Sequence, residues 1–142
     1  MRRVVLDTNI LVSAFLFSER GGPPVELLRS AKEERFTLIT SEAMLDELEG
    51  VLTRDARAQE RYGYTPAAAA AYRTLLEARA VVVKPRKPFP KVSRDPDDDL
   101  ILATAALAKA DYLVTGDNDL LTIGEHQGVR IVTPRQFLDA LL

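Results

Sequence analysis

The sequence predicts an α/β fold of three layers, in which helices cover both faces of a central, mainly parallel sheet of five strands. Short runs of β-branched residues alternate with segments of helical periodicity along the chain. This alternation implies crossover connections, which place helices on both faces of a parallel sheet. The 142 residues, 46% of them hydrophobic, fit one domain that spans residues 1–142.

Local signals define the elements of the first half. Val-Val-Leu at 4–6 is typical of a buried strand, and residues 9–16 have the pattern of a following helix. Two prolines open a second helix at 23–32, because proline is favoured in the first helical turn. FTLIT at 36–40 predicts the next strand. Ser41 is a favoured N-cap for the helix after it, whose apolar side chains recur at helical spacing.

The second half continues the alternation. Thr65 followed by Pro66 is a strong helix start, a cap with proline at the first position. Three prolines within residues 84–94 predict an irregular loop. The other elements expected are short helices at 54–64 and 118–125, longer helices at 65–79 and 97–109, strands at 80–83, 112–115 and 129–132, and a C-terminal helix from Pro134.

Composition excludes several classes of site. The chain has no cysteine, which excludes disulfides, thiolate catalysis and zinc ribbons. No apolar stretch approaches the ~20 residues that cross a bilayer, so we expect a cytoplasmic protein without a membrane partner. The net charge of −2 argues mildly against nucleic-acid binding, but the charges are patterned. Acids cluster at 95–99 and 117–119, just after five basic side chains, Lys84, Arg86, Lys87, Lys91 and Arg94.

Four acidic positions, distant in sequence, are expected at one edge of the sheet. Asp7 directly follows the first strand, and Asp117 comes two residues after the strand at 112–115. Asp98 and Asp99 lie in the first turn of the helix that leads into that strand, and Glu47 lies in the helix after FTLIT. In open parallel sheets, ligands bind outside the carboxyl ends of the strands. We therefore expect these acids to converge there.

Such convergence requires a counter-charge. Two carboxylates ~4 Å apart repel by about 4 kcal/mol at an effective dielectric constant of 20. Either some acids are protonated or a divalent cation holds them. Oxygen ligands without His or Cys favour Mg²⁺ or Mn²⁺, and such a cation suits phosphate chemistry, because it acidifies water and neutralises charge on phosphoryl oxygens.

Each residue also has an ordinary structural interpretation. Asp7 is a favoured helix cap, Glu47 has the pattern of a solvated helix residue, and first-turn acids at 97–99 suit the helix dipole. Asp117 is compatible with a plain turn. Four further polar residues could orient ligands or cap helices: Thr8, Asn9, Thr115 and Asp119. The basic loop could steer a phosphate backbone or be a solvated connector.

Four motifs in order carry a family resemblance: VVLDTNILVSA, SEAMLDELEGVL, DDDLILATAALAKADYLVTGDNDLL and RIVTPRQFL. Together they resemble the PIN-domain nucleases, and most closely the VapC-like toxin components of prokaryotic toxin–antitoxin pairs. The resemblance implies a PIN-like fold, bound Mg²⁺ or Mn²⁺, endonucleolytic cleavage of RNA, a homodimer, and inhibition by a protein antitoxin.

The resemblance also assigns the acids. The first family Asp matches Asp7, the helical Glu matches Glu47, and the last Asp, in the T-x-D pattern, matches Asp117. Helical spacing favours Asp99 as the third catalytic acid, and Asp98 remains the alternative, so both are candidate metal ligands.

The expected function is metal-dependent cleavage of single-stranded or looped RNA, whose backbone can reach a recessed site. A phosphoryl-accepting receiver domain would need an Asp after the middle strand and a lysine after the last one. The sequence has VVVKP and TPRQF there instead. A non-catalytic metal-binding regulatory or partner-binding α/β domain remains the second interpretation.

Overall fold

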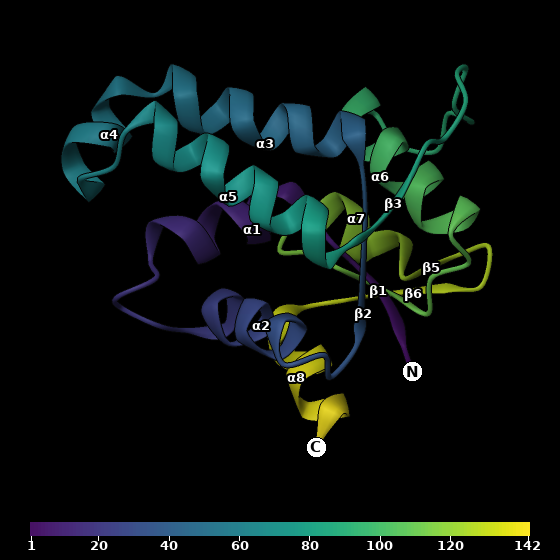
Figure 1. Ribbon diagram of the computed structural model, residues 1–142. Coiled ribbons are helices and arrows are strands. Elements are labelled where there is room, and N and C mark those ends of the chain that lie inside the picture. Colours follow the sequence, from purple (N-terminus) through teal and green to yellow (C-terminus); the bar gives the residue numbers. More distant parts are fainter.

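The computed structural model describes residues 1–142, and its centre is a sheet with the strand order β3-β2-β1-β4-β6-β5 (Figure 1). All neighbouring strands are parallel except β5 and β6. The expected α/β class is confirmed, but the sheet has six strands instead of five. The strands are β1 (Arg3–Leu6), β2 (Thr37–Ser41), β3 (Val81–Val83), β4 (Tyr112–Val114), β5 (Glu125–His126) and β6 (Val129–Val132).

The additional strand, β5, lies where the sequence predicted the end of a helix. Helix α7 (Asn118–Ile123) stops early, at Gly124, which has a φ of 75°. Gln127 and Gly128 then have φ values of 49° and 83° between β5 and β6. Two consecutive residues with positive φ form the tight turn that suits an antiparallel hairpin. The short hairpin therefore replaces the last turn of the predicted helix.

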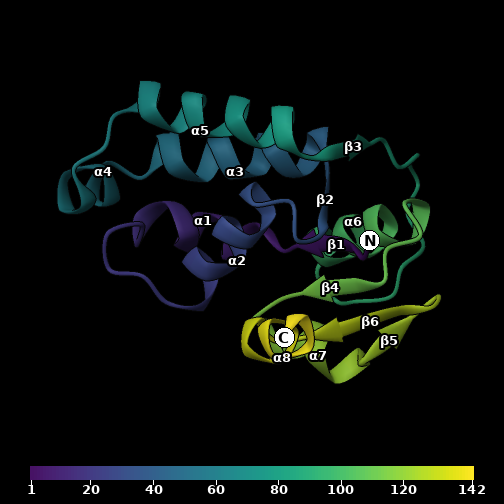
Figure 2. The same ribbon diagram turned by 60° about the horizontal axis from the view of Figure 1, so that its bottom comes forward.

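Helices cover both faces of the sheet. Along β1, Val4 and Leu6 face one core, to which α1, α2, α3, α5 and α8 contribute, and Val5 faces a second core formed mainly by α6 and α7. The long helices α3 and α5 lie side by side in both views (Figure 2). None of the helices has the length and apolar character that a membrane crossing requires. The remaining bounds are α1 (Thr8–Leu16), α2 (Pro23–Lys32), α3 (Glu42–Arg54), α4 (Ala56–Tyr62), α5 (Pro66–Arg79), α6 (Pro96–Leu107) and α8 (Pro134–Leu141).

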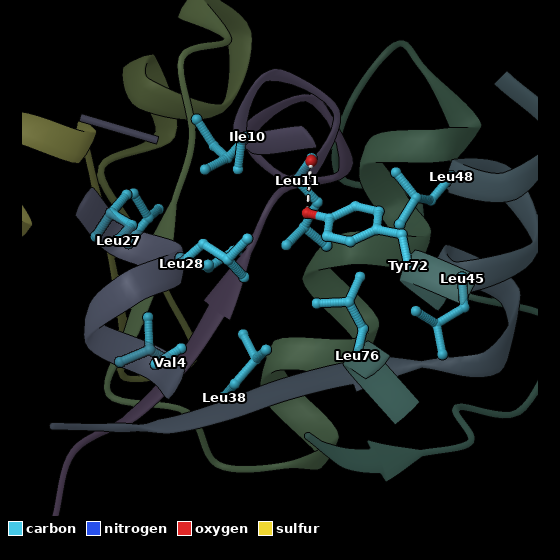
Figure 3. Close-up of a cluster of buried hydrophobic side chains, with 14 of the residues drawn as sticks. Val4, Ile10, Leu11, Leu27, Leu28, Leu38, Leu45, Leu48, Tyr72 and Leu76 are labelled. Atoms are coloured by element: carbon cyan, nitrogen blue, oxygen red, sulfur yellow. Dashed lines mark hydrogen bonds between the residues drawn. The ribbon is translucent and has the colours of Figure 1, made fainter. Parts of the chain in front are cut away.

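Tyr72 of α5 connects α5 to α1 inside the larger core (Figure 3). Its ring is buried beside leucines of α1, α3 and α5, and its hydroxyl donates a hydrogen bond of 2.8 Å to the carbonyl oxygen of Leu11. Burial raises the pKa of the Tyr72 hydroxyl far above its ordinary value, so the hydroxyl stays protonated and remains a donor.

We expect Tyr72→Phe to lower the free energy of unfolding by about 0.5–1.5 kcal/mol, because the ring packing is kept and one buried hydrogen bond is lost. Urea unfolding measures this change. Tyr112→Phe is the matched control, since the half-buried Tyr112 ring packs on Phe137 and its hydroxyl forms no hydrogen bond in the structure. Equal changes in the two variants would show that the Tyr72 hydroxyl contributes nothing specific.

Candidate active site

The pairing of β1 with β4 brings Asp7 beside Thr115 at the carboxyl edge of the sheet. Leu6 is in register with Val114, and the backbone N–H of Asp7 donates to the carbonyl oxygen of Val114. The Thr115 hydroxyl donates to Asp7 Oδ2 over 2.6 Å and accepts from the backbone N–H of Asp117 over 3.0 Å. One fully buried hydroxyl therefore fixes the buried Asp7 side chain and the backbone at Asp117.

Asp7 occupies the N-cap position of α1, but its side chain makes no capping hydrogen bond. Burial raises the pKa of Asp7, and the negative charge of Asp117 adds to the rise. The Thr115 hydroxyl and the nearby backbone N–H groups of Thr8 and Asn9 oppose it. The Asp7 carboxylate is only 4% exposed and does not cap its helix, so its ionisation costs free energy.

The two candidates for the third acid, adjacent in α6, have different partners. Asp98 Oδ2 accepts from the Ser93 hydroxyl over 3.0 Å, and burial together with the charges of Asp117, Asp95 and Asp7 raises the Asp98 pKa to about 6. Asp99 Oδ1 instead accepts the backbone N–H groups of Val92 and Ser93, at 2.9 and 2.8 Å, which lower the Asp99 pKa. Asp98 thus faces the other acids, whereas Asp99 holds the end of the 84–94 loop.

Asp117 and Asp119 complete the group around Asp98. One carboxylate oxygen from each of the three lies within 4.8 Å of the others. Asp117 also caps α7, since its Oδ1 accepts the backbone N–H of Asp119 over 3.3 Å. The exposed Asp119 carboxylate lies 3.9 Å from the Arg94 guanidinium, which is almost fully exposed.

Glu47, half-buried on α3, approaches the same edge. Burial raises its pKa, and so do the negative charges of Asp97, Asp7, Asp95 and Asp98. Glu47 therefore lies within the field of the other acids, although it does not belong to the group of carboxylates within 4.8 Å of one another. We refer to these five residues as the acid cluster: Asp7, Glu47, Asp98, Asp117 and Asp119.

The acid cluster has the chemistry that a divalent cation requires. Its ligand atoms are carboxylate oxygens, without sulfur or imidazole, as hard cations prefer. Three of its members have raised pKa values, because burial and the neighbouring negative charges disfavour their ionised forms. The buried Thr8 hydroxyl beside Asp7 has no hydrogen-bond partner in the structure. These features fit Mg²⁺ or Mn²⁺ and do not distinguish between them.

The other candidate residues are largely exposed. Asn9 is exposed, as are the five basic side chains of the loop. Lys84, Arg86 and Lys87 line a groove of about 950 Å³ together with the start of α3, the helix that carries Glu47.

Sequence reasoning did not identify Ser93 and Asp95 as part of the site. Asp95 caps α6 by accepting the backbone N–H of Asp97 over 2.9 Å, so the helix begins at Pro96, one residue earlier than expected. The Asp95-Pro96 pair, a cap residue followed by proline, was the available signal. No sequence signal identified the hydroxyl of Ser93 as a partner of Asp98.

Comparison with protein families gives one result for this chain. The family model described as PIN domain matches residues 3–119, which includes every member of the acid cluster. No curated protein matches the chain. Residues 120–142, outside the matched region, contribute β5, β6 and α8 to the same fold.

Without a divalent cation, we expect the free energy of unfolding to fall as the pH rises from about 4 to about 7. Asp7, Glu47 and Asp98 bind their protons more tightly in the folded than in the unfolded chain, so ionising them favours unfolding. The Asp98 pKa near 6 sets the upper part of this window. Urea unfolding in EDTA at a series of pH values should show a loss of about 1–3 kcal/mol, which Asp98→Asn should reduce. Stability that increases over this range would contradict the account.

Proposed function

The chain belongs to the PIN-domain family, whose members are generally nucleases, and from this premise we propose that it is a Mg²⁺-dependent endoribonuclease. The observation that carries the proposal is the buried Asp7, which does not cap its helix and is linked through Thr115 to Asp117, a member of the carboxylate group Asp98, Asp117 and Asp119. Mn²⁺ is the alternative ion for the same oxygen ligands.

Each acid has a proposed role. Asp7, Asp98 and Asp117 hold the cation, and Glu47 and Asp119 hold it directly or through water. When bound, the cation supplies a Lewis acid that neutralises charge on the phosphodiester and acidifies water. Thr115 keeps Asp7 oriented through the 2.6 Å hydrogen bond. Asp99, favoured by helical spacing as the third catalytic acid, is proposed instead to position the loop that carries Ser93.

The proposed substrate is single-stranded or looped RNA. An acidic pocket repels phosphates, so the backbone needs positive charge at the margins of the site as well as the cation. The proposed source of that charge is the exposed side chains Lys84, Arg86, Lys87, Lys91 and Arg94, of which Arg94 lies 3.9 Å from Asp119. The groove lined by the first three also borders the start of α3, the helix that carries Glu47, and is the proposed path for the RNA.

We propose three broader features on the resemblance of the four sequence motifs and the family match. The protein is the toxin component of a toxin–antitoxin pair, it forms a homodimer, and a protein antitoxin inhibits it. We also propose that residues 1–142 form a single domain, and the pairing of β6 with β4 and the packing of α8 against α2 support this.

Asp7→Asn should abolish RNA cleavage and leave the stability of the metal-free protein equal or higher. The substitution removes one repelling charge, while the asparagine oxygen can still accept the Thr115 hydrogen bond. Cleavage of an unstructured RNA is measured with Mg²⁺ or Mn²⁺ and again with EDTA, and metal-free stability by thermal unfolding.

Asp139→Asn, an equal charge change on the exposed face of α8, is the control and should retain wild-type activity. Cleavage that survives chelation would contradict metal dependence. If the wild-type protein binds the cation through Asp7 and cleaves no RNA, the non-catalytic interpretation replaces this one.

The adjacent pair in α6 allows a second test. Asp98→Asn should lower kcat by about 100-fold or more, because the substitution removes a charged cation ligand. Asp99→Asn should retain activity within about threefold, since the asparagine oxygen can still accept the N–H groups of Val92 and Ser93. The reverse order of effects would return the catalytic role to Asp99.

A further inference from the structure

A second surface with binding chemistry lies at the opposite end of α1 from the acid cluster. The acids adjoin the start of α1, whereas Phe17 follows its last residue and lies beside the end of α4. Both views show α4 at this end of the molecule (Figures 1 and 2). A hollow of about 420 Å³ lies there. We call it the aromatic–arginine groove and define it by Phe17, Arg20, Arg61 and Tyr62.

The floor of this groove is anchored to the fold. Gly63 ends α4 in the left-handed conformation, with a φ of 68°, and so turns the chain between Tyr62 and Tyr64. The Tyr64 hydroxyl donates to the carbonyl oxygen of Leu52 over 2.8 Å, and its ring meets the edge of Phe15 at 5.0 Å. Phe17 and Tyr62 therefore lie next to chain segments that these contacts hold in place.

Two adjacent rings lie in the groove, and each has an arginine guanidinium beside it. The Phe17 and Tyr62 rings pack edge to face at 5.6 Å. The Arg20 guanidinium lies 5.1 Å from the centre of the Phe17 ring, and that of Arg61 lies 5.4 Å from the centre of the Tyr62 ring. Both arginines are exposed, and neither forms an ion pair or a side-chain hydrogen bond. Each guanidinium therefore lies against a ring while its N–H donors stay free.

These features point to a nucleic-acid strand with unpaired bases. Bases of single-stranded RNA stack on aromatic rings and on guanidinium planes, and free arginine N–H groups bind phosphates. Two arginines against one glutamate, Glu19, leave the lining of the groove positively charged. We infer that the aromatic–arginine groove binds single-stranded RNA outside the cleavage site. The inference deepens the proposed function and rests on it for the identity of the substrate.

The separation of the two sites sets the length of RNA that can use both. Helix α1 has nine residues, which at ~1.5 Å per residue span about 14 Å. A strand stacked with the ~3.4 Å rise of duplex DNA would cover this distance in about four nucleotides. RNA much longer than this can contact the groove while another part of the same strand lies at the acid cluster.

The test uses the full-length protein in EDTA, so that the probe is not cleaved. Fluorescence anisotropy measures the Kd for an unstructured RNA of about 16 nucleotides. Phe17→Leu with Tyr62→Leu should raise the Kd about tenfold by removing the stacking surfaces. Arg20→Gln with Arg61→Gln should also raise the Kd and reduce the slope of log Kd against log salt by about 1.4.

Arg54→Gln with Arg57→Gln is the matched control. It removes two exposed arginines beside or within α4 that do not line the groove, and it should leave the Kd within about twofold. Circular dichroism and light scattering verify that each variant is folded and keeps its oligomeric state. If the variant with Phe17→Leu and Tyr62→Leu is unfolded, the test rests on the variant with Arg20→Gln and Arg61→Gln, through its Kd and the salt dependence of that Kd.

The outcomes separate this inference from the proposed nuclease function. Wild-type Kd values in both groove variants would overturn the inference, even if the protein cleaves RNA. A change in oligomeric state without a change in Kd would overturn it in favour of a protein interface. Loss of RNA binding in both variants, while the control still binds, would support it even if no metal-dependent cleavage were found.

Discussion

The concentration of negative charge at one sheet edge is the constraint on which the rest of this structure depends. Asp7, Asp98 and Glu47 all have raised pKa values, with burial as the largest cause. The backbone keeps these groups together against their repulsion: Asp7 and Thr115 each donate a backbone hydrogen bond to the neighbouring strand, at 2.9 and 3.0 Å. The hydrogen bonds of β1, β4 and β6 therefore hold Asp7 and Thr115 at the edge where the acids gather.

At the start of α6, acids that are close in sequence have different partners and different roles. Asp95 caps the helix, Asp98 faces the cluster, and Asp99 binds the backbone of the preceding loop. Successive helical residues point about 100° apart, so adjacent acids meet different surroundings. Asp99 therefore binds the loop backbone and has a lowered pKa, whereas Asp98 lies at the cluster and has a raised pKa.

Sequence patterns predict much of this architecture, since the ends of parallel strands and the starts of crossover helices meet at one edge. The placement of Asp7, Asp117 and Glu47 near that edge follows from the positions of their elements. The choice between Asp98 and Asp99 does not, because it depends on how the chain at Val92 and Ser93 turns back onto α6. The same holds for β5, whose two residues carry no strand pattern and depend on the positive φ values of Gln127 and Gly128.

The members of the acid cluster come from helices that pack in different hydrophobic cores of the protein. Glu47 lies on α3, which packs mainly in the larger core, whereas Asp98 lies on α6, which packs in the other. The Thr104 hydroxyl of α6 and the Ser41 hydroxyl, at the end of β2, also lie within hydrogen-bonding distance, 3.2 Å apart. A cation shared by these helices would add a bond between the layers, and binding only to the folded chain stabilises it by mass action. That gain is greatest where the acids are ionised, above the Asp98 pKa of about 6, which is also where their repulsion is strongest. The binding of such a cation would therefore couple to the packing of the two layers through these carboxylates.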